Sequence, residues 1–281
     1  MNSDSVIPLI SVIIPSFNSG NTIIQSVSSV IRELESVICD WEIIIIDDGS
    51  SDNSYETLED FISKNKYTRI KVIRQDNKGV ASARNAGLKL SVGDLVAFND
   101  SDDEWLKGKL EYQIDVLKAD PSVVMVGGMH DNVRFSRLWK RQGDLAEIGL
   151  KKMIFKFYFA TQGVLFKNSI LEKTGLFDPN QRNAEEGVFF YRMTYYAKCV
   201  LVNKILTRNI VGKKTWGESG LSGQIHRQSF GELKNLTTIF KEGLISRFLF
   251  ISALIFSLIK YIRRIIIYYF SLIVRYIISL K

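Results

Sequence analysis

The chain has 281 residues, of which 46% are hydrophobic and 24% are charged, and its formal net charge is +7 at pH 7. This composition is typical of a folded protein, and the length allows one large domain or two small ones. The excess of positive charge lies after Phe240, whereas the preceding residues carry 30 bases and 29 acids. A nucleic-acid-binding surface on the folded domain is therefore not expected.

The cysteines and the N-terminus indicate a reducing compartment. Cys39 and Cys199 form neither a C-x-x-C pair nor part of a ligand cluster, as expected of plain buried thiols. Residues 1–8 lack the basic and apolar regions of a cleaved signal peptide, so we expect the protein not to be secreted by that route.

Strand and helix patterns alternate through the first hundred residues. Short runs rich in β-branched residues predict strands at 9–15, 42–46, 69–74 and 95–98. Between them, apolar residues at helical spacing predict helices over 23–34, around 58–62 and over 79–87. This alternation predicts an α/β fold with a mainly parallel central sheet, flanked by helices and connected by right-handed crossovers.

The fourth predicted strand runs into four acids, Asp100, Asp102, Asp103 and Glu104, after which Trp105 opens a helical pattern. Acids this close raise each other's pKa unless a positive charge lies among them. In extended backbone, Asp100 and Asp102 would leave the same face at the strand's carboxyl end. Carboxylates suit Mg²⁺ or Mn²⁺, with substrate phosphates completing the shell. The alternative is a solvated turn in which Asp102 or Asp103 caps the next helix.

Other strands also end in candidate binding residues. Phe17 follows the first strand, and Asp47 and Asp48 follow the second, while no Rossmann or P-loop glycine pattern is present. Strand ends of one parallel sheet converge on one edge. An aromatic ring for stacking on a base, carboxylates for a base N–H and a metal site would then line one crevice. Taken singly, Phe17 could pack on the core and Asp48-Gly49 could be an ordinary turn.

Four segments together resemble the successive signatures of the family 2 glycosyltransferases: Ser11 to Asn18, Glu42 to Asp52, Gly79 to Gly87 and Asp100 to Asp103. The resemblance is specific over residues 9–120 and weaker to about 240. It implies a GT-A fold, a nucleotide-diphosphate-sugar donor with a UDP-sugar favoured, and an inverting transfer assisted by Mn²⁺ or Mg²⁺.

The resemblance also implies roles for single residues. Asp100 and Asp102 would be the metal ligands, and Phe17 and Asp48 would contact the nucleobase. The complete set implied for the nucleotide sugar is Pro15, Phe17, Asn18, Asp47, Asp48, Gly79, Arg84, Asn85, Asp100 and Ser101, with Asp103 as a further candidate.

The second half of the chain is expected to build the acceptor side. Patterns predict strands at 123–126 and 163–167, a short helix over 168–174 and a turn at 177–179. His130, Arg134, Arg137 and Trp139 could face an acceptor or form a solvated surface. We expect residues 1–240 to form the glycosyltransferase domain, with 9–120 as its nucleotide-sugar half and 121–240 as its acceptor half.

The segment from Asn183 to Met193 is similar to the family's Glu-Asp segment at the start of a helix, in which the second acid is the catalytic base. Glu186 occupies that place here, although the family usually has Asp, and Glu185 is the second candidate. The alternative is an acidic first turn stabilised by the helix dipole.

A glycine-rich stretch, Trp216 to Ser222, lies where the family often has a mobile segment over the donor. Trp216 or Gly217 occupies the place of the metal-binding His of many relatives, and His226 is a candidate third ligand a few residues beyond. The segment Gln224 to Gln228 lacks the tryptophan of the Q-x-x-R-W pattern in processive synthases, which favours the addition of single sugars.

Residues 241–281 differ from the rest because they are both basic and strongly apolar. The longest uncharged stretch, Phe248 to Ile259, has 12 residues, short of the ~20 that a spanning helix needs. On a helical wheel, Lys260, Arg263, Arg264, Arg275 and Lys281 share one arc. An amphipathic helix on an anionic membrane surface would have this pattern. A core or oligomer helix is the alternative.

These patterns predict an inverting glycosyltransferase, of hexosyl- or N-acetylhexosaminyl-transferase type. It would lie peripherally or monotopically on the cytoplasmic face of the cell membrane. It would add a sugar to a lipid-linked saccharide or a cell-surface polysaccharide such as lipopolysaccharide or capsule. The alternative function is a catalytically silent module of the same fold that binds a nucleotide sugar or a partner. A homo-oligomer is compatible with either.

Overall fold

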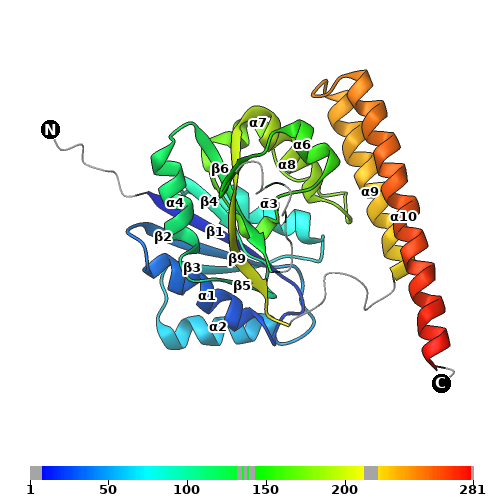
Figure 1. Cartoon of the computed structure of the whole chain (residues 1–281). Helices are drawn as coiled ribbons and strands as arrows, with labels where there is room; N and C mark the ends of the chain where they lie inside the picture. The colour runs from blue at the N-terminus through cyan, green and yellow to red at the C-terminus, as the bar shows by residue number, and fades with distance from the viewer. Residues whose placement is uncertain (1–7, 132–134, 136–137, 139–142, 212–220, 280–281) are drawn as a thin grey trace.

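The computed structural model in Figure 1 describes residues 8–131, 135, 138, 143–211 and 221–279. The expected strands of the first half are present as β1 (Leu9–Ser16), β2 (Asp40–Asp47), β3 (Ile70–Arg74) and β4 (Leu95–Phe98). They pair in parallel in the order β3-β2-β1-β4. Their carboxyl ends therefore meet at one edge of the sheet.

The second half continues the same sheet in mixed directions. Beyond β4 follow β8 (Val164–Lys167), β6 (Val123–His130), β9 (Lys198–Asn209) and β5 (Asp103–Trp105), and β7 (Leu145–Glu147) also pairs with β9. β8 is antiparallel to β4 and β6, β9 is parallel to β6, and β5 is antiparallel to β9. The prediction of a mixed, mainly parallel central sheet is therefore confirmed.

Helices cover both faces of the sheet because β1 is apolar on both sides. Val12 and Ile14 pack with α1 (Ile23–Glu35), α2 (Ser54–Asn65) and α4 (Lys109–Ala119). Ile13 belongs to the core on the opposite face, with α3 (Val80–Leu90), α6 (Leu150–Phe155) and α8 (Glu186–Tyr196). The predicted short helix at 168–174 is a 3-10 turn, η2 (Asn168–Ile170), followed by α7 (Leu171–Thr174), and a second 3-10 turn, η1 (Thr161–Gly163), precedes β8.

The backbone after β4 differs from the sequence-based expectation. Asp100 to Asp102 form a tight turn, closed by the Asp103 N–H donating to the Asp100 carbonyl at 3.0 Å, rather than extended backbone. The prediction that Trp105 opens a helix is also wrong, because Trp105 ends β5 and is fully buried. The next helix, α4, begins at Lys109 with Gly108 at its N-cap, so neither Asp102 nor Asp103 caps it.

The C-terminal region is an antiparallel pair of long helices, α9 (Leu221–Lys241) and α10 (Arg247–Ser279), that packs beside the sheet domain (Figure 1). Leu244, Ile245 and Ala253 belong to the main hydrophobic core. The start of α10 is thus part of the folded domain. Within the described residues, no helix combines the length and the hydropathy that crossing a bilayer requires.

Candidate functional site

A cavity of about 700 Å³ lies at the edge where β1, β2 and β4 end. Phe17, half exposed, forms part of its wall, and the chain segments after all three strands contribute to it. Of the residues predicted to bind a nucleotide sugar or a metal, those lining this cavity are Pro15, Phe17, Asn18, Asp48, Gly79, Arg84, Asp100, Ser101, Asp102 and Glu185. The structure brings these residues together from five separate parts of the chain.

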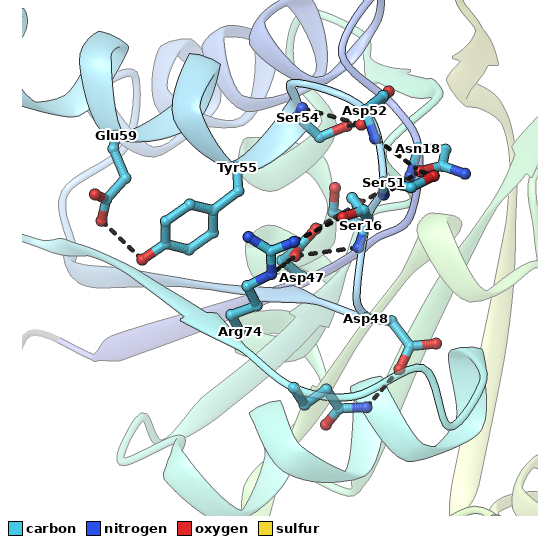
Figure 2. Close-up of polar contacts among 12 residues, drawn as sticks. Ser16, Asn18, Asp47, Asp48, Ser51, Asp52, Ser54, Tyr55, Glu59 and Arg74 are labelled. Carbon is cyan, nitrogen blue, oxygen red and sulfur yellow. Dashed lines mark hydrogen bonds and ion pairs between the residues drawn. The ribbon is translucent and has the colours of Figure 1, made fainter.

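Asn18 and Asp48 hold the wall in shape (Figure 2). The Asn18 side-chain oxygen accepts the Ser51 N–H at 2.8 Å, which ties the loop after β1 to the loop after β2. The Asp48 carboxylate accepts the N–H groups of Lys78 at 2.9 Å and Gly79 at 2.7 Å and the side-chain amide of Gln75 at 2.6 Å. These bonds fix Asp48 at the cavity. Its contact with a nucleobase remains a prediction.

Asp47 and Asn85 do not line the cavity. The buried Asp47 carboxylate accepts hydrogen bonds from Ser50 and pairs with Arg74 Nε at 3.3 Å (Figure 2). Asn85 is also buried, and its side chain bonds both the carbonyl and the N–H of Phe177, at 2.9 and 3.0 Å. Each side chain instead holds two segments of the fold together, and contact of either with a nucleotide sugar is not supported by this placement.

The four acids after β4 are divided between two environments. Asp100 and Asp102 line the cavity, whereas Asp103 and Glu104 belong to β5. Burial, and then the charges of Asp100 and Asp102, raise the pKa of Asp103 to about 8. Burial acts in the same direction on Glu104, but hydrogen bonds and charge from Arg208 outweigh it, and its pKa is lowered. Asp103 does not line the cavity.

Arg84 supplies the positive charge that this cluster of acids requires. Its guanidinium is buried and donates to Asp100 Oδ1 at 2.8 Å and to Glu185 Oε1 at 3.0 Å. Burial acts to lower the pKa of Arg84, but the charges of Asp100 and Glu185 more than offset it and the pKa is raised. Arg84 thus joins the end of β4 to the start of α8 through one buried cation.

A second cavity, of about 370 Å³, adjoins the first. Arg84, Asp100 and Glu185 line both, so the two cavities meet at these three side chains. Glu186 lines only the second, together with the aromatic segment Phe157 to Phe159 and with His130, Phe135 and Gln162. Burial and then the charge of Glu185 raise the pKa of Glu186 to about 7, which suits a group that accepts a proton near neutral pH.

The donor set fits a hard divalent cation only in part. Asp100 and Asp102 offer carboxylate oxygens to the first cavity, and one Asp100 oxygen is already bonded to Arg84. Within the part of the chain that the structure describes, no three His, Cys, Asp or Glu side chains gather as a complete metal site. A cation here would need phosphate oxygens from a bound ligand, which is how Mg²⁺ is commonly held.

The remaining predicted residues fall elsewhere. The prediction that His226 is a third metal ligand is not supported, because His226 lies on α9 with its Nδ1 2.7 Å from the Tyr261 hydroxyl of α10, and it lines neither cavity. Trp216, Arg134, Arg137 and Trp139 lie outside the described residues. Sequence reasoning missed Arg182, an exposed base that lines the first cavity beside Gly79, because no motif surrounds it.

The model of a family described as glycosyl transferase family 2 matches residues 11–178, more than half of the chain. The chain is 39% identical over 120 residues to the UDP-Glc:alpha-D-GlcNAc-diphosphoundecaprenol beta-1,3-glucosyltransferase WfgD of Escherichia coli, covering 42% of this chain and 45% of that protein. It is 31% identical over 201 residues to an uncharacterized glycosyltransferase of Nostoc sp., covering 67% and 60%. The chain thus spans less than two thirds of either relative.

Solved structures share the fold at low sequence identity. A crystal structure of S. aureus TarS 1-349 in complex with UDP-GlcNAc has a TM-score of 0.61 at 20% identity, covering 81% of this chain and 66% of that one. The mannosyltransferase PcManGT from Pyrobaculum calidifontis, in complex with GDP-Man and Mn²⁺, has a TM-score of 0.62 at 16% identity, covering 84% and 65%. These likenesses concern the fold.

Proposed function

Because the chain belongs to glycosyl transferase family 2 and has the GT-A fold, we propose that it transfers a sugar from a nucleoside-diphosphate donor to a saccharide hydroxyl. The observation that carries this proposal is the junction of the two cavities. Asp100 lies at the junction itself, Asp102 lines the first cavity, and Glu186, with its raised pKa, lines the second. A donor diphosphate and an acceptor hydroxyl could therefore approach one anomeric carbon from opposite sides.

The first cavity is the proposed donor site. Phe17 offers an aromatic face to a base and Asp48 a fixed acceptor, and Arg182 adds positive charge at the same wall. A divalent cation, Mn²⁺ or Mg²⁺, held by Asp100, Asp102 and the donor's phosphate oxygens would neutralise the charge that builds on the leaving diphosphate. The UDP-containing names of the E. coli relative and of the TarS complex favour a UDP-sugar.

Glu186 is the proposed general base. As the acceptor hydroxyl attacks the anomeric carbon, its proton passes to the Glu186 carboxylate. The new carbon–oxygen bond forms while the bond from that carbon to the diphosphate oxygen breaks, and the nucleoside diphosphate leaves with the electron pair. One displacement of this kind inverts the anomeric centre. Positioned proton transfer contributes about 10²–10⁴ in rate.

The second cavity is the proposed acceptor site. Its aromatic lining suits a sugar ring, which presents an apolar face to stack on. The names of relatives that act on a diphosphoundecaprenol-linked sugar or belong to teichuronic acid biosynthesis favour a lipid-linked or cell-surface polysaccharide acceptor. The division into a donor half, 9–120, and an acceptor half, 121–240, is part of this proposal, because most of the second cavity's wall comes from residues after 127.

Residues 241–281 are proposed to bring the enzyme to the cytoplasmic face of a membrane. The exposed side of α10 supports this, since its large apolar residues include Ile255, Ile259, Ile262 and Ile266, each about half exposed or more.

The test is nucleoside-diphosphate release. Purified protein is incubated with Mn²⁺ and a panel of UDP-sugars, first selected by thermal stabilisation because a ligand of the folded state raises the melting temperature. Release of UDP that depends on both a sugar donor and an added lipid-linked saccharide is the expected result. Donor binding without any UDP release would instead identify a catalytically silent binding module.

A further inference from the structure

The segment that carries the proposed base is held from behind by α9. Gln181 lies in the connection between α7 and α8, residues 175–185, which leads into Glu186, and Asn235 lies in the second half of α9. Both amide side chains are buried, Asn235 to 2% exposure and Gln181 to 6%. They are more than 50 residues apart in sequence and are hydrogen-bonded to each other in the folded chain.

The two amides bond each other and the backbone of the connection. Gln181 Nε2 donates to Asn235 Oδ1 at 2.8 Å and to the carbonyls of Asn183 and Ala184 at 3.0 Å each. Asn235 Nδ2 donates to the Ala184 carbonyl at 2.8 Å. The carbonyl that immediately precedes Glu185 therefore receives hydrogen bonds from both amides, one of them belonging to α9.

The backbone at this point is shaped for the contact. Ala184 has φ +52°, in the left-handed region that an alanine rarely adopts. A Cβ on Gly187 would overlap the Asn235 amide, and one on Gly231 of α9 would overlap the Asn183 carbonyl oxygen. Two glycines on opposite sides thus let α9 approach the connection closely enough for the amides to bond it.

The segment before α8 is held from two sides by other parts of the chain. The first turn of α8 begins at Glu186, its N-cap is Glu185, and no side chain caps it. Arg84 fixes Glu185 from the cavity side. On the other side, Gln181 and Asn235 hold the backbone through the carbonyls of Asn183 and Ala184.

We propose that the buried amide pair of Asn235 and Gln181 is a positioning device for the catalytic base, so that one residue of α9, Asn235, acts on the site without lining it. Neither side chain lines either cavity, and they act only through the backbone that aims Glu186. The inference rests on the proposed role of Glu186 as base. Displacement of a reacting group by about 1 Å can cost on the order of a hundredfold in rate.

The experiment compares Asn235→Ala with Leu236→Ala in the full chain. Leu236 is the next residue on α9 and is equally buried, but it packs in the hydrophobic core and makes no contact with the connection through a polar group. We expect Asn235→Ala to lower kcat for transfer by about tenfold to a hundredfold. The dissociation constant of UDP with Mn²⁺ should stay near that of the wild type, and Leu236→Ala should keep kcat.

Gln181→Ala tests the same device from the connection side, and it serves alone if Asn235→Ala does not fold. The double variant should lose no more than either single one, because residues that act as one unit are not additive. Equal losses of kcat in Asn235→Ala and Leu236→Ala would overturn the proposal, as would a full kcat in Asn235→Ala.

Hydrogen–deuterium exchange of residues 181–187 separates this proposal from the proposed function. Exchange there should be faster in Asn235→Ala than in Leu236→Ala whether or not turnover is detected. If the wild type transfers no sugar, the proposed role of Glu186 as base fails, while faster exchange in Asn235→Ala still shows that the amide pair holds residues 181–187 in place. If exchange in Asn235→Ala is unchanged, the positioning role of the amide pair is rejected, while sugar transfer by the wild type is unaffected by that result.

Discussion

At the residue scale, the acids of this chain differ because their surroundings differ. Glu104 has arginine partners and a lowered pKa, whereas the pKa values of Asp103 and Glu186 are raised by burial and by neighbouring acids. Of the latter two, only Glu186 borders a cavity that a substrate could enter. Its environment, more than its residue type, favours it as the base in place of the aspartate usual in the family.

Replacing Glu186 by Gln removes the proton acceptor but keeps the size of the side chain. We expect transfer to fall by about 10²–10⁴, with UDP and Mn²⁺ binding retained in calorimetry because Glu186 does not line the first cavity. In the wild type, kcat/KM should rise with pH through about 7, since only the deprotonated carboxylate accepts a proton. Near-normal turnover of Glu186→Gln would rule the role out.

Arg84→Gln tests the buried cation between the acids. Removing one partner of a buried ion pair leaves charge uncompensated and typically costs about 3–5 kcal/mol of stability. Because the Arg84 charge acts to lower the pKa of Glu186, the rise of kcat/KM should also move to higher pH. Urea unfolding and a pH–rate profile measure the two effects, with Arg84→Lys as the charge-preserving comparison. A variant as stable as the wild type would contradict the bridging role.

At the element scale, α4 depends on α1. Gly108 at its N-cap and Leu110 donate their N–H groups to the buried Glu33 carboxylate of α1, at 3.2 and 3.4 Å. Lys109 between them is fully buried, lies 3.8 Å from the centre of the Trp105 ring and donates to Gln113 at 2.9 Å. Glu33 of α1 thus caps the N-terminus of α4, and Lys109 is buried where the two helices meet.

Burial lowers the pKa of Lys109 to about 7, against an ordinary value of 10.5. From about pH 7 to 10.5 the unfolded chain binds a proton that the folded chain does not, so stability should rise with pH in this range and level off below it. In Lys109→Met this rise should be absent. Urea unfolding at pH 7 and pH 9 checks this prediction. The free energy of unfolding of the wild type should increase by on the order of a few kcal/mol between these pH values, relative to that of Lys109→Met. Parallel pH dependences would refute it.

At the scale of the whole molecule, two of the basic residues of α10 face α9. Lys260 and Arg264 pair with Glu232 of α9 at 3.1 and 2.7 Å. The predicted basic stripe is therefore partly used in packing against α9, and the side chains of Arg275 and Lys281 lie outside the described residues. The outward face of α10 is apolar, with Arg263 exposed near it. Membrane binding through this face would depend on apolar insertion more than on lipid charge.

We therefore expect the triple variant Ile255→Ser, Ile259→Ser and Ile266→Ser to lose binding to vesicles of phosphatidylglycerol and phosphatidylcholine by at least about tenfold, because each isoleucine contributes about 1.5–3 kcal/mol when buried. Co-sedimentation measures the loss, and added salt should weaken wild-type binding only slightly. Ile38→Ser with Val92→Ser, exposed on the sheet domain, is the matched control. Unchanged sedimentation of the triple variant, or conversion of a dimer to a monomer, would reject a lipid surface.

The sequence by itself determined the family, the strands of the first half and the acids at their ends. These features are contiguous motifs, so neighbours in the chain suffice to specify them, as Phe17, Asp48 and Asp100 illustrate. Only the tertiary structure decided which side chains face the cavities. Asp47, Asn85 and Asp103 belong to the interior, Arg84 joins two acids, and Asn235 reaches the base segment from α9. The physical reason is that burial and hydrogen bonding depend on residues brought together by folding, and the spacing of residues along the chain does not encode which of them meet.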